Sequence, residues 1–242
     1  MAGLTPTSPI PIVALDVPTL AAAKDLVRRL GPAPDFYKVG LQLYTSEGPA
    51  VVEWLRGQSK RVFLDIKLHD IPNTVRGAAE SAASLGVDLV TAHAIGGDGM
   101  LRAAVEGASK PGMGTGILAV TVLTSLTAQS YGDAIGAPGI NIRNAVLRLA
   151  AAAARSGARG VVCAGTEAAG IRAAHGEGFG TLVPGLRPEG SPADDQARST
   201  TPAEARAAGA TWVIVGRAVT TARDPAAAYK ALVTDLAGIS SG

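Results

Sequence analysis

The sequence predicts an α/β protein that folds as a single (β/α)₈ (TIM) barrel, and three observations favour this fold class. Short apolar, β-branched runs recur along the chain, and most are followed by an Ala-rich segment of helical periodicity. The runs are continuously apolar, which is typical of strands covered on both faces of a parallel sheet. Eight such units in 242 residues match the ~250 residues typical of this barrel.

The expected elements alternate in chain order. The predicted strands are residues 10–16, 36–39, 61–67, 89–93, 116–121, 160–163, 181–184 and 212–215. The predicted helices are residues 20–30, 46–56, 74–85, 99–108, 141–156, 167–175, 202–208 and 225–236. The fifth and seventh connections are longer and looser. We find no internal boundary, so 1–242 is treated as one domain with frayed tails at 1–9 and 238–242.

An open dinucleotide-binding sheet is the main alternative fold. No Gly-x-Gly-x-x-Gly follows the first predicted strand, where the chain reads Asp16-Val17-Pro18-Thr19. The tight phosphate turn of that fold is therefore missing, which favours the barrel.

Composition narrows the function classes. Hydrophobic residues make up 47% and charged residues 17% of the chain, which excludes a disordered protein. The single cysteine, Cys163, excludes an internal disulfide and is compatible with the reducing cytoplasm, where we expect the protein. A net charge of +2 is too small for a nucleic-acid binder recognised by charge. We expect neither a transmembrane segment nor a signal peptide, because no long apolar stretch occurs and residues 1–9 lack the required pattern.

Polar side chains gather where the predicted strands end. They are Asp16, Lys38, Asp65, Lys67, His93, the 121–125 segment, Arg187 and Arg217. In a (β/α)₈ barrel these positions surround one mouth, where active sites lie. Helix capping explains an Asp or Thr at such a turn. It does not explain the lysines, since cations disfavour helix N-termini. We therefore expect a functional site.

The third predicted strand carries the most informative stretch, Asp65-Ile66-Lys67-Leu68-His69-Asp70-Ile71-Pro72-Asn73-Thr74. Strand period places Asp65 and Lys67 on one side, and the neighbouring second strand brings Lys38 beside Asp65. The result is a row of alternating charge: Lys38, Asp65, Lys67 and Asp70. A structural ion-pair network is the alternative, but apolar replacements of such networks are often no less stable. Stability alone is therefore a poor reason for four charges here.

The charge row favours particular chemistry. A lysine between two carboxylates stays protonated and is a poor nucleophile, which argues against a Schiff base. We expect Lys67 to donate a proton to a strongly basic carbon. Two carboxylates could also hold Mg²⁺, but the interleaved lysines compete for their oxygens. We therefore expect no metal and no cofactor.

Two loops at the other side of the mouth favour an anion. Pro184-Gly185-Leu186-Arg187 follows the seventh strand, and Gly216-Arg217 follows the eighth. Loops after these strands often bind phosphate in barrels. Glycine lets the backbone approach an oxyanion, and arginine adds a forked donor. Either arginine alone could instead be a solvated side chain, but the pair predicts a phosphate site.

At these residues the sequence resembles the orotidine 5′-phosphate decarboxylase family. The resemblance runs from Ala14-Leu15-Asp16 to Gly216-Arg217, and its most specific part is the 65–74 string. Further matches are Lys38-Val39-Gly40, Val120-Thr121-Val122-Leu123-Thr124-Ser125, Pro184-Gly185-Leu186-Arg187-Pro188 and Asp195-Gln196.

The resemblance implies a cofactor-free (β/α)₈ homodimer that converts orotidine 5′-phosphate to UMP and CO₂ in de novo pyrimidine synthesis. Lys67 would protonate C6 of the pyrimidine, and Asp65 would lie near the departing carboxylate. Lys38 would bridge Asp65 and the ribose, and Asp16 would bind ribose hydroxyls with Lys38.

The remaining roles are also implied by the resemblance. Asp70 and Thr74 would reach across the dimer into the partner's site. Thr124 would contact the edge of the pyrimidine, and Gln196 would link base and phosphate. The expected phosphate ligands are Arg187, Gly216 and Arg217.

Two other functions stay open. A Mg²⁺-dependent sugar-phosphate decarboxylase or synthase of the same superfamily shares an Asp-x-Lys-x-x-Asp pattern, but the Ile71-Pro72-Asn73-Thr74 and Leu123-Thr124-Ser125 strings count against it. A non-catalytic phosphate-sensing barrel would need the phosphate loops without the charge row, so the complete row disfavours it.

Overall fold

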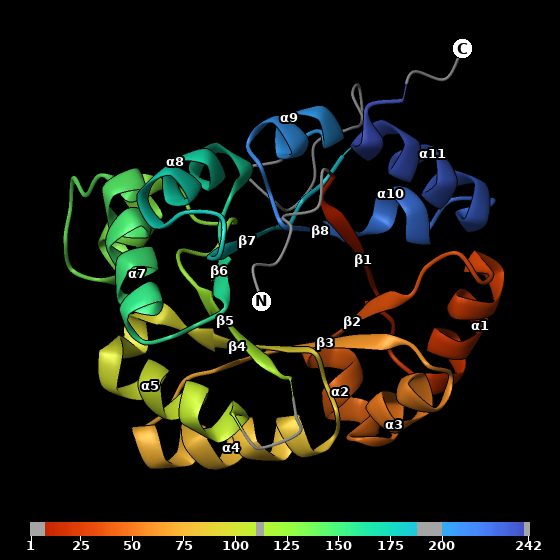
Figure 1. Cartoon of the computed structure of the whole chain (residues 1–242), viewed down its shortest axis with the longest axis horizontal. Coiled ribbons are helices and arrows are strands. Elements are labelled where there is room, and N and C mark those ends of the chain that lie inside the picture. The colour runs from red at the N-terminus through yellow and green to blue at the C-terminus, as the bar shows by residue number, and fades with distance from the viewer. Residues whose placement is uncertain (1–7, 110–113, 188–199, 240–242) are drawn as a thin grey trace.

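The protein is a closed barrel of eight parallel strands in sequence order, with helices arranged around it (Figure 1). This computed structural model describes residues 8–109, 114–187 and 200–239. The strands are β1 (Ile10–Ala14), β2 (Phe36–Gly40), β3 (Arg61–Leu68), β4 (Leu89–His93), β5 (Gly116–Val120), β6 (Gly160–Val162), β7 (Gly180–Val183) and β8 (Trp212–Val215). β1 pairs with both β2 and β8, which closes the barrel. The predicted fold class is confirmed.

Helices cover the outer surface of the sheet. The longer ones are α1 (Leu20–Leu30), α3 (Ala50–Gly57), α4 (Pro72–Ser84), α5 (Gly97–Ala108), α7 (Ile142–Arg155), α8 (Gly165–His175) and α11 (Pro225–Ala237). The shorter ones are α2 (Leu41–Glu47), η1 (Ala94–Gly96), α6 (Ala128–Ala134), α9 (Pro202–Ala207) and α10 (Arg217–Thr220). Each predicted helix has a counterpart, while α2, η1, α6 and α10 are additional.

The predicted helix at 46–56 is wrong at its start, because the chain breaks there. α2 ends before Gly48, which adopts φ +62° and donates its N–H to the carbonyl of Tyr44 at 2.8 Å. Positive φ suits glycine and ends a helix. Pro49 then precedes α3. Residues 46 and 47 therefore belong to the helix before the break.

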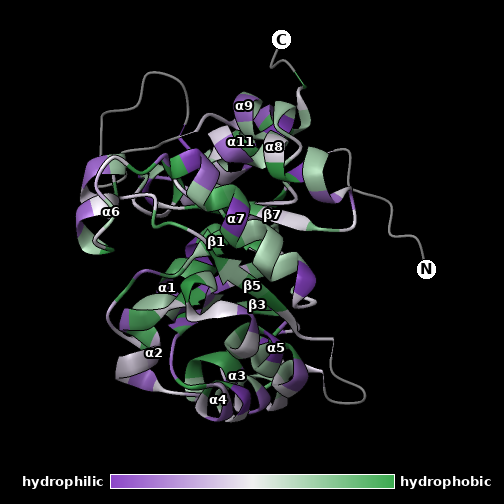
Figure 2. Cartoon of the chain, turned by 90° about the vertical axis from the view of Figure 1, so that its left-hand side faces the viewer, coloured by the Kyte–Doolittle hydropathy of each residue, from purple (hydrophilic) through white to green (hydrophobic). Residues whose placement is uncertain are grey.

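Side chains on the strands alternate between two apolar layers. One set fills the barrel interior: Ile12, Ala14, Phe36, Phe63, Leu89, Leu118, Leu182, Trp212 and Ile214. The other set, which includes Leu64 and Val90, packs beneath the helices. Figure 2 shows strands coloured mainly as hydrophobic and outer helices with hydrophilic positions mixed in. Burying each large apolar side chain contributes about 1.5–3 kcal/mol to the stability of the fold. The interior layer is therefore a stable, well-packed support for the residues at the barrel mouth.

None of the helices in the described ranges is both long enough and apolar enough to span a bilayer.

Candidate active site

A cavity of about 200 Å³ lies at the carboxyl ends of the barrel strands. Its polar lining comes from residues that the sequence analysis singled out: Asp16, Lys38, Asp65, Lys67 and Thr124. Its apolar lining is Phe63, Val120, Val122, Leu123, Val162, Leu182, Pro184 and Ile214. Several of these apolar side chains belong to the interior layer. The charges therefore lie beside an apolar lining, where electrostatic interactions are stronger than in bulk water.

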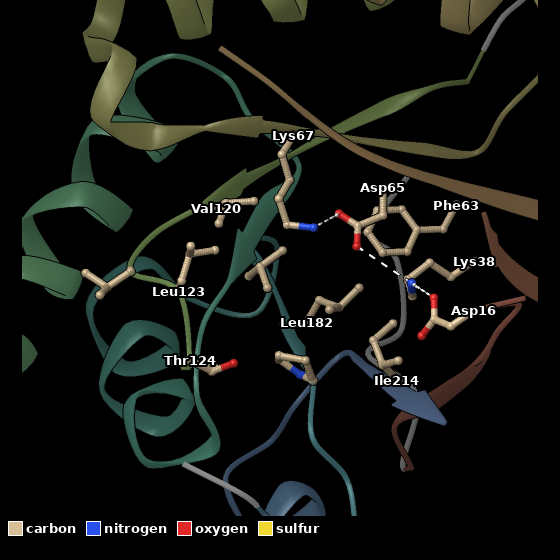
Figure 3. Close-up of a pocket in the computed structure, with 13 residues that line it drawn as sticks. Asp16, Lys38, Phe63, Asp65, Lys67, Val120, Leu123, Thr124, Leu182 and Ile214 are labelled. Atoms are coloured by element: carbon tan, nitrogen blue, oxygen red, sulfur yellow. Dashed lines mark hydrogen bonds and ion pairs between the residues drawn. The ribbon is translucent and has the colours of Figure 1, made fainter. Parts of the chain in front are cut away.

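Four charged side chains form a continuous row along one wall of the cavity (Figure 3). Lys38 Nζ lies 2.7 Å from Asp16 Oδ1 and 3.9 Å from Asp65 Oδ2. Lys67 Nζ donates to Asp65 Oδ1 at 2.9 Å. The Lys38 and Asp65 side chains are only 10% and 16% exposed. Each of these two groups thus depends on oppositely charged neighbours, since an unpaired buried charge is costly.

Within one chain, the row contains a different set of residues from the expected one. It runs Asp16, Lys38, Asp65, Lys67, so it includes Asp16 beside Lys38 and does not include Asp70. Thr19 caps helix α1, accepting a hydrogen bond from the N–H of Ala22. Asp16 is therefore available to Lys38 and the cavity instead of serving as that cap.

Strand β3 is irregular where it carries Asp65 and Lys67. The register is Leu64 with Val90 and then Leu68 with Ala92, so β3 advances four residues while β4 advances two. Within this bulge Lys67 has φ +51°. A left-handed conformation costs about 1–2 kcal/mol for a residue with a Cβ, and such outliers cluster at functional sites. The bulge, and not a regular strand, aims both side chains into the cavity.

Gly40, at the end of β2, leaves room for the charge row. A Cβ at this position would lie 3.0 Å from Lys38 Nζ and 3.3 Å from Asp16 Oδ1. The sequence analysis noted Gly40 only as part of a matching string. The close approach of the ion pair explains the glycine physically.

The predicted phosphate ligands lie on the loops after β7 and β8. Arg187 follows an isolated bridge between Leu186 and Thr200, and its N–H donates to the carbonyl of Thr200 at 2.9 Å. Gly216 precedes α10, and Arg217, the first residue of α10, is exposed. None of the three belongs to the cavity lining formed by the described residues. In the chain they follow the lining residues Pro184 and Ile214 within three positions. Gln196 lies outside the described residues.

Comparison with known proteins identifies the family of this barrel. The model of the Orotidine 5′-phosphate decarboxylase / HUMPS family matches residues 9–232. The chain belongs to this family.

Named relatives and solved structures agree with the family assignment. The orotidine 5′-phosphate decarboxylase of Anaeromyxobacter dehalogenans is 52% identical over 92% of this chain and 96% of its own length. That of Thermobifida fusca is 48% identical over 93% of this chain and 94% of its own. The crystal structure of the Lactobacillus acidophilus orotidine 5′-phosphate decarboxylase superposes with a TM-score of 0.83 at 35% identity, covering 95% of this chain and 99% of that one.

Two residues of the family string lie outside the cavity lining that the described residues form. Asp70 and Thr74 are exposed, and neither joins the lining formed by the described residues. Asp70 Oδ1 accepts the N–H of Ile71 at 2.6 Å. Their assignment to the site of a neighbouring subunit stays a prediction. Their position outside their own site is the arrangement that such sharing requires.

His93 lies beside the charge row at the end of β4. Its ring centroid is 5.5 Å from that of His69. Burial lowers the pKa of His93, the charges of His69 and Lys67 lower it further, and Asp65 acts in the opposite direction. His93 is therefore neutral at pH 7. It is absent from the lining that the described residues form, but it lies near enough to Lys67 and Asp65 to interact with their charges.

The carboxylates of the site are already engaged by cations. Asp16 and Asp65 share Lys38, and Asp65 also accepts from Lys67. Across the described ranges, no group of three or more His, Cys, Asp or Glu side chains gathers as a metal site would require. In this arrangement the ammonium groups of Lys38 and Lys67 occupy carboxylate oxygens that a divalent cation would need as ligands.

Proposed function

We propose that this protein decarboxylates orotidine 5′-phosphate to UMP and CO₂ without a cofactor, with Lys67 as the proton donor. The observation that carries the proposal is the Lys67 ammonium inside the cavity, 2.9 Å from Asp65 and at the end of a charge row. Membership of the decarboxylase family supports the same activity.

The chemistry requires a group that meets a carbanion. When the bond between C6 and the carboxylate breaks, its electron pair remains on C6 and CO₂ leaves. Lys67 then transfers a proton to C6, and the amine regains a proton from solvent. Because the carbanion lies in the plane of the ring, the π-system delocalises it poorly. A fixed cation at that point stabilises charge that exists only as the reaction proceeds.

One lysine does not account for the whole rate enhancement. Enzymes lower barriers by up to about 23 kcal/mol, whereas removing one oriented donor costs about 2.7–4 kcal/mol. The apolar floor, the preorganised charge row and remote binding energy from the phosphate must contribute the rest. We assign Asp65 to the neighbourhood of the departing carboxylate, and its contact with Lys67 Nζ holds that lysine in place.

The remaining residues are assigned to the ribose, the pyrimidine and the phosphate of the substrate. We assign the ribose hydroxyls to Asp16 and Lys38, and the pyrimidine edge to Thr124. Arg187, Gly216 and Arg217 are assigned to the phosphate, with Gln196 linking phosphate and base. Since the proposed substrate belongs to de novo pyrimidine synthesis, we also place the enzyme in the cytoplasm.

We further propose that the enzyme is a homodimer whose sites are shared. Two exposed apolar side chains follow adjacent strands at the mouth side: Ile71 after β3 and Ile95 after β4. Ile71 is 68% exposed and adjoins Asp70. Apolar residues gathered at one end favour a protein contact there. That contact would carry Asp70 and Thr74 toward the partner's cavity.

Loss of the orotate absorbance tests the activity directly. Purified protein is incubated with orotidine 5′-phosphate with and without a chelator, and the absorbance and UMP are followed. We expect full turnover in both samples. Activity that disappears with the chelator would favour a Mg²⁺-dependent relative. Binding of phosphate ligands without any turnover would favour a sensing barrel.

A further inference from the structure

We propose that Thr91, on β4, is a positioning residue that holds both Asp65 and Lys67 in their active arrangement. This inference rests on the decarboxylase activity proposed above and adds a residue of the neighbouring strand to that site. Thr91 does not line the cavity formed by the described residues, so its action on the reaction is through its two partners.

A single hydroxyl contacts both residues of the charge row that lie on β3. Thr91 is fully buried. Its Oγ1 donates to Asp65 Oδ1 at 3.0 Å and accepts the backbone N–H of Lys67 at 2.9 Å. A threonine hydroxyl offers one donor and acceptor lone pairs. Here the donor serves the carboxylate and an acceptor serves the lysine backbone.

The bulge in β3 explains why this hydroxyl is needed. Between Leu64 and Leu68, β3 carries three residues opposite the single residue Thr91 of β4. In this bulge the N–H of Lys67 pairs with the side chain of β4. The Thr91 hydroxyl thus takes the role that a backbone carbonyl has in a regular ladder. A buried N–H without such a partner costs about 1–3 kcal/mol in general.

The same contact holds Lys67 in its unusual backbone conformation. Its φ of +51° persists only where the surroundings determine it. The Thr91 contact fixes the Lys67 backbone, and the contact from Lys67 Nζ to Asp65 fixes the other end of the side chain. Without the hydroxyl, the bulge is free to relax and the ammonium can leave its position.

Thr91 also orients the carboxylate of Asp65. Oδ1 receives both Lys67 Nζ and the Thr91 hydroxyl, which leaves Oδ2 facing Lys38 at 3.9 Å. Rotation of this carboxylate would disturb its contacts with both lysines. Since misplacement of a reacting group by about 1 Å can cost roughly 100-fold in rate, the effect should appear in the chemical step.

The test replaces Thr91 by valine, which keeps the shape and removes both hydrogen bonds. We expect Thr91→Val to lower kcat for orotidine 5′-phosphate by about 10- to 100-fold. KM and the Kd of UMP should change by less than about threefold, because ribose and phosphate contacts remain. Thr91→Ser retains the hydroxyl and should restore kcat to within about threefold of wild type.

Thr181→Val is a matched control on β7. Thr181 is also buried, but its hydroxyl has no hydrogen-bond partner among the described residues and does not line the cavity. We expect wild-type kcat for this variant. Should Thr91→Val fail to fold, Thr91→Cys supplies the same comparison, because a thiol is a weak donor and acceptor.

The outcomes separate this inference from the function on which it rests. Wild-type protein inactive on orotidine 5′-phosphate would contradict the proposed function. An active wild type with unchanged kcat in folded Thr91→Val would overturn the role of Thr91 alone. A lower melting temperature with normal kcat would show a purely structural residue and would also overturn it.

Discussion

Lys67 owes its position to contacts at both ends of the residue. The ammonium is bound to Asp65, and the backbone is held in a bulge at positive φ. Neither contact involves Arg187, Gly216 or Arg217, the residues proposed to bind phosphate. Binding of a nucleotide and protonation of its ring carbon should therefore be separable by substitution at this residue.

Lys67→Ala should abolish decarboxylation while the protein still binds UMP. Loss of a general acid typically costs about 10²- to 10⁴-fold, and here the cation that stabilises the carbanion is lost as well. We expect at least a 10³-fold fall in kcat by that reasoning. UMP affinity, measured by calorimetry, should change by less than about tenfold. A variant with near-normal kcat would refute the proton-donor role.

Arg217→Ala should distinguish ligands by their phosphate. Arg217 is exposed at the start of α10, where a guanidinium can reach an anion bound at the mouth. Hydrogen bonds to charged groups are worth about 1.5–3 kcal/mol, so UMP should bind about 10- to 100-fold more weakly. Uridine affinity, measured in the same titration series, should stay nearly constant. Equal losses for both ligands would contradict the assignment.

His93 should make the fold less stable in mild acid. Burial and nearby positive charge hold its pKa below the usual value in the folded state. The unfolded chain therefore binds more protons once the pH falls below about 6.5, and the free energy of unfolding decreases there. We expect His93→Gln to show a smaller decrease than wild type between about pH 7.5 and pH 5.5 in urea unfolding. Identical decreases would contradict this account.

At the scale of elements, the strands were predictable and the bulge was not. Apolar β-branched runs located all eight strands, because each is buried on both faces. Strand period correctly placed Asp65 and Lys67 on one side, although the path between them is irregular. The bulge depends on Thr91 from another strand. No local pattern in 61–68 contains that information.

The helices that escaped prediction are short. α2 begins at Leu41, its N-cap residue Gly40 has no side chain to cap it, and α10 spans only Arg217–Thr220. α6 has a capping box between Thr127 and Ser130, a local signal that could have located it. Short helices carry little amphipathic pattern, and their stability comes from tertiary packing. All three lie in connections that follow the carboxyl ends of strands, at the mouth of the barrel.

The packing of α4 against α5 depends on a glycine. A Cβ at Gly107 would collide with the carbonyl oxygen of Arg76 on α4 and lie 3.2 Å from Ala79 Cβ. A Cβ added at Gly77, on α4, would meet no atom within 4 Å. We expect Gly107→Ala to lower the free energy of unfolding by about 1–3 kcal/mol through overpacking.

Gly77→Ala is the matched control in the same helix pair. It should raise the free energy of unfolding by about 0.5–1 kcal/mol, because alanine favours a helix interior. Chemical denaturation of both variants measures the contrast. Equal effects of the two substitutions would show that the contact between these helices is not tight.

At the scale of the whole molecule, closure of the barrel assembles the site. Asp16, Lys38, Asp65, Lys67 and Thr124 are spread over more than a hundred residues, yet all line one cavity. They were predictable because parallel strands of a barrel end at one face. The apolar lining was not, since its residues look like any other core side chains in the sequence. Asp70 and Thr74 do not join the lining that the described residues form.

Two inactive variants should restore activity together if the sites are shared. In a mixed dimer of Lys67→Ala and Asp70→Ala chains, one site combines the intact Lys67 of one chain with the intact Asp70 of the other. The second site carries both substitutions. Random pairing then leaves about a quarter of all sites complete. We expect co-expressed variants to recover that share of the wild-type rate, while each variant alone stays nearly inactive.

The doubly substituted chain is the decisive control. A chain carrying both Lys67→Ala and Asp70→Ala completes no site with either single variant, so those mixtures should stay inactive. If each subunit contained its whole site, mixing the single variants would restore nothing. Asp70 is exposed in its own chain and adjoins the exposed Ile71. Recovery of activity in the mixture of single variants, with none in the mixtures that contain the double variant, would support the proposed reciprocal arrangement.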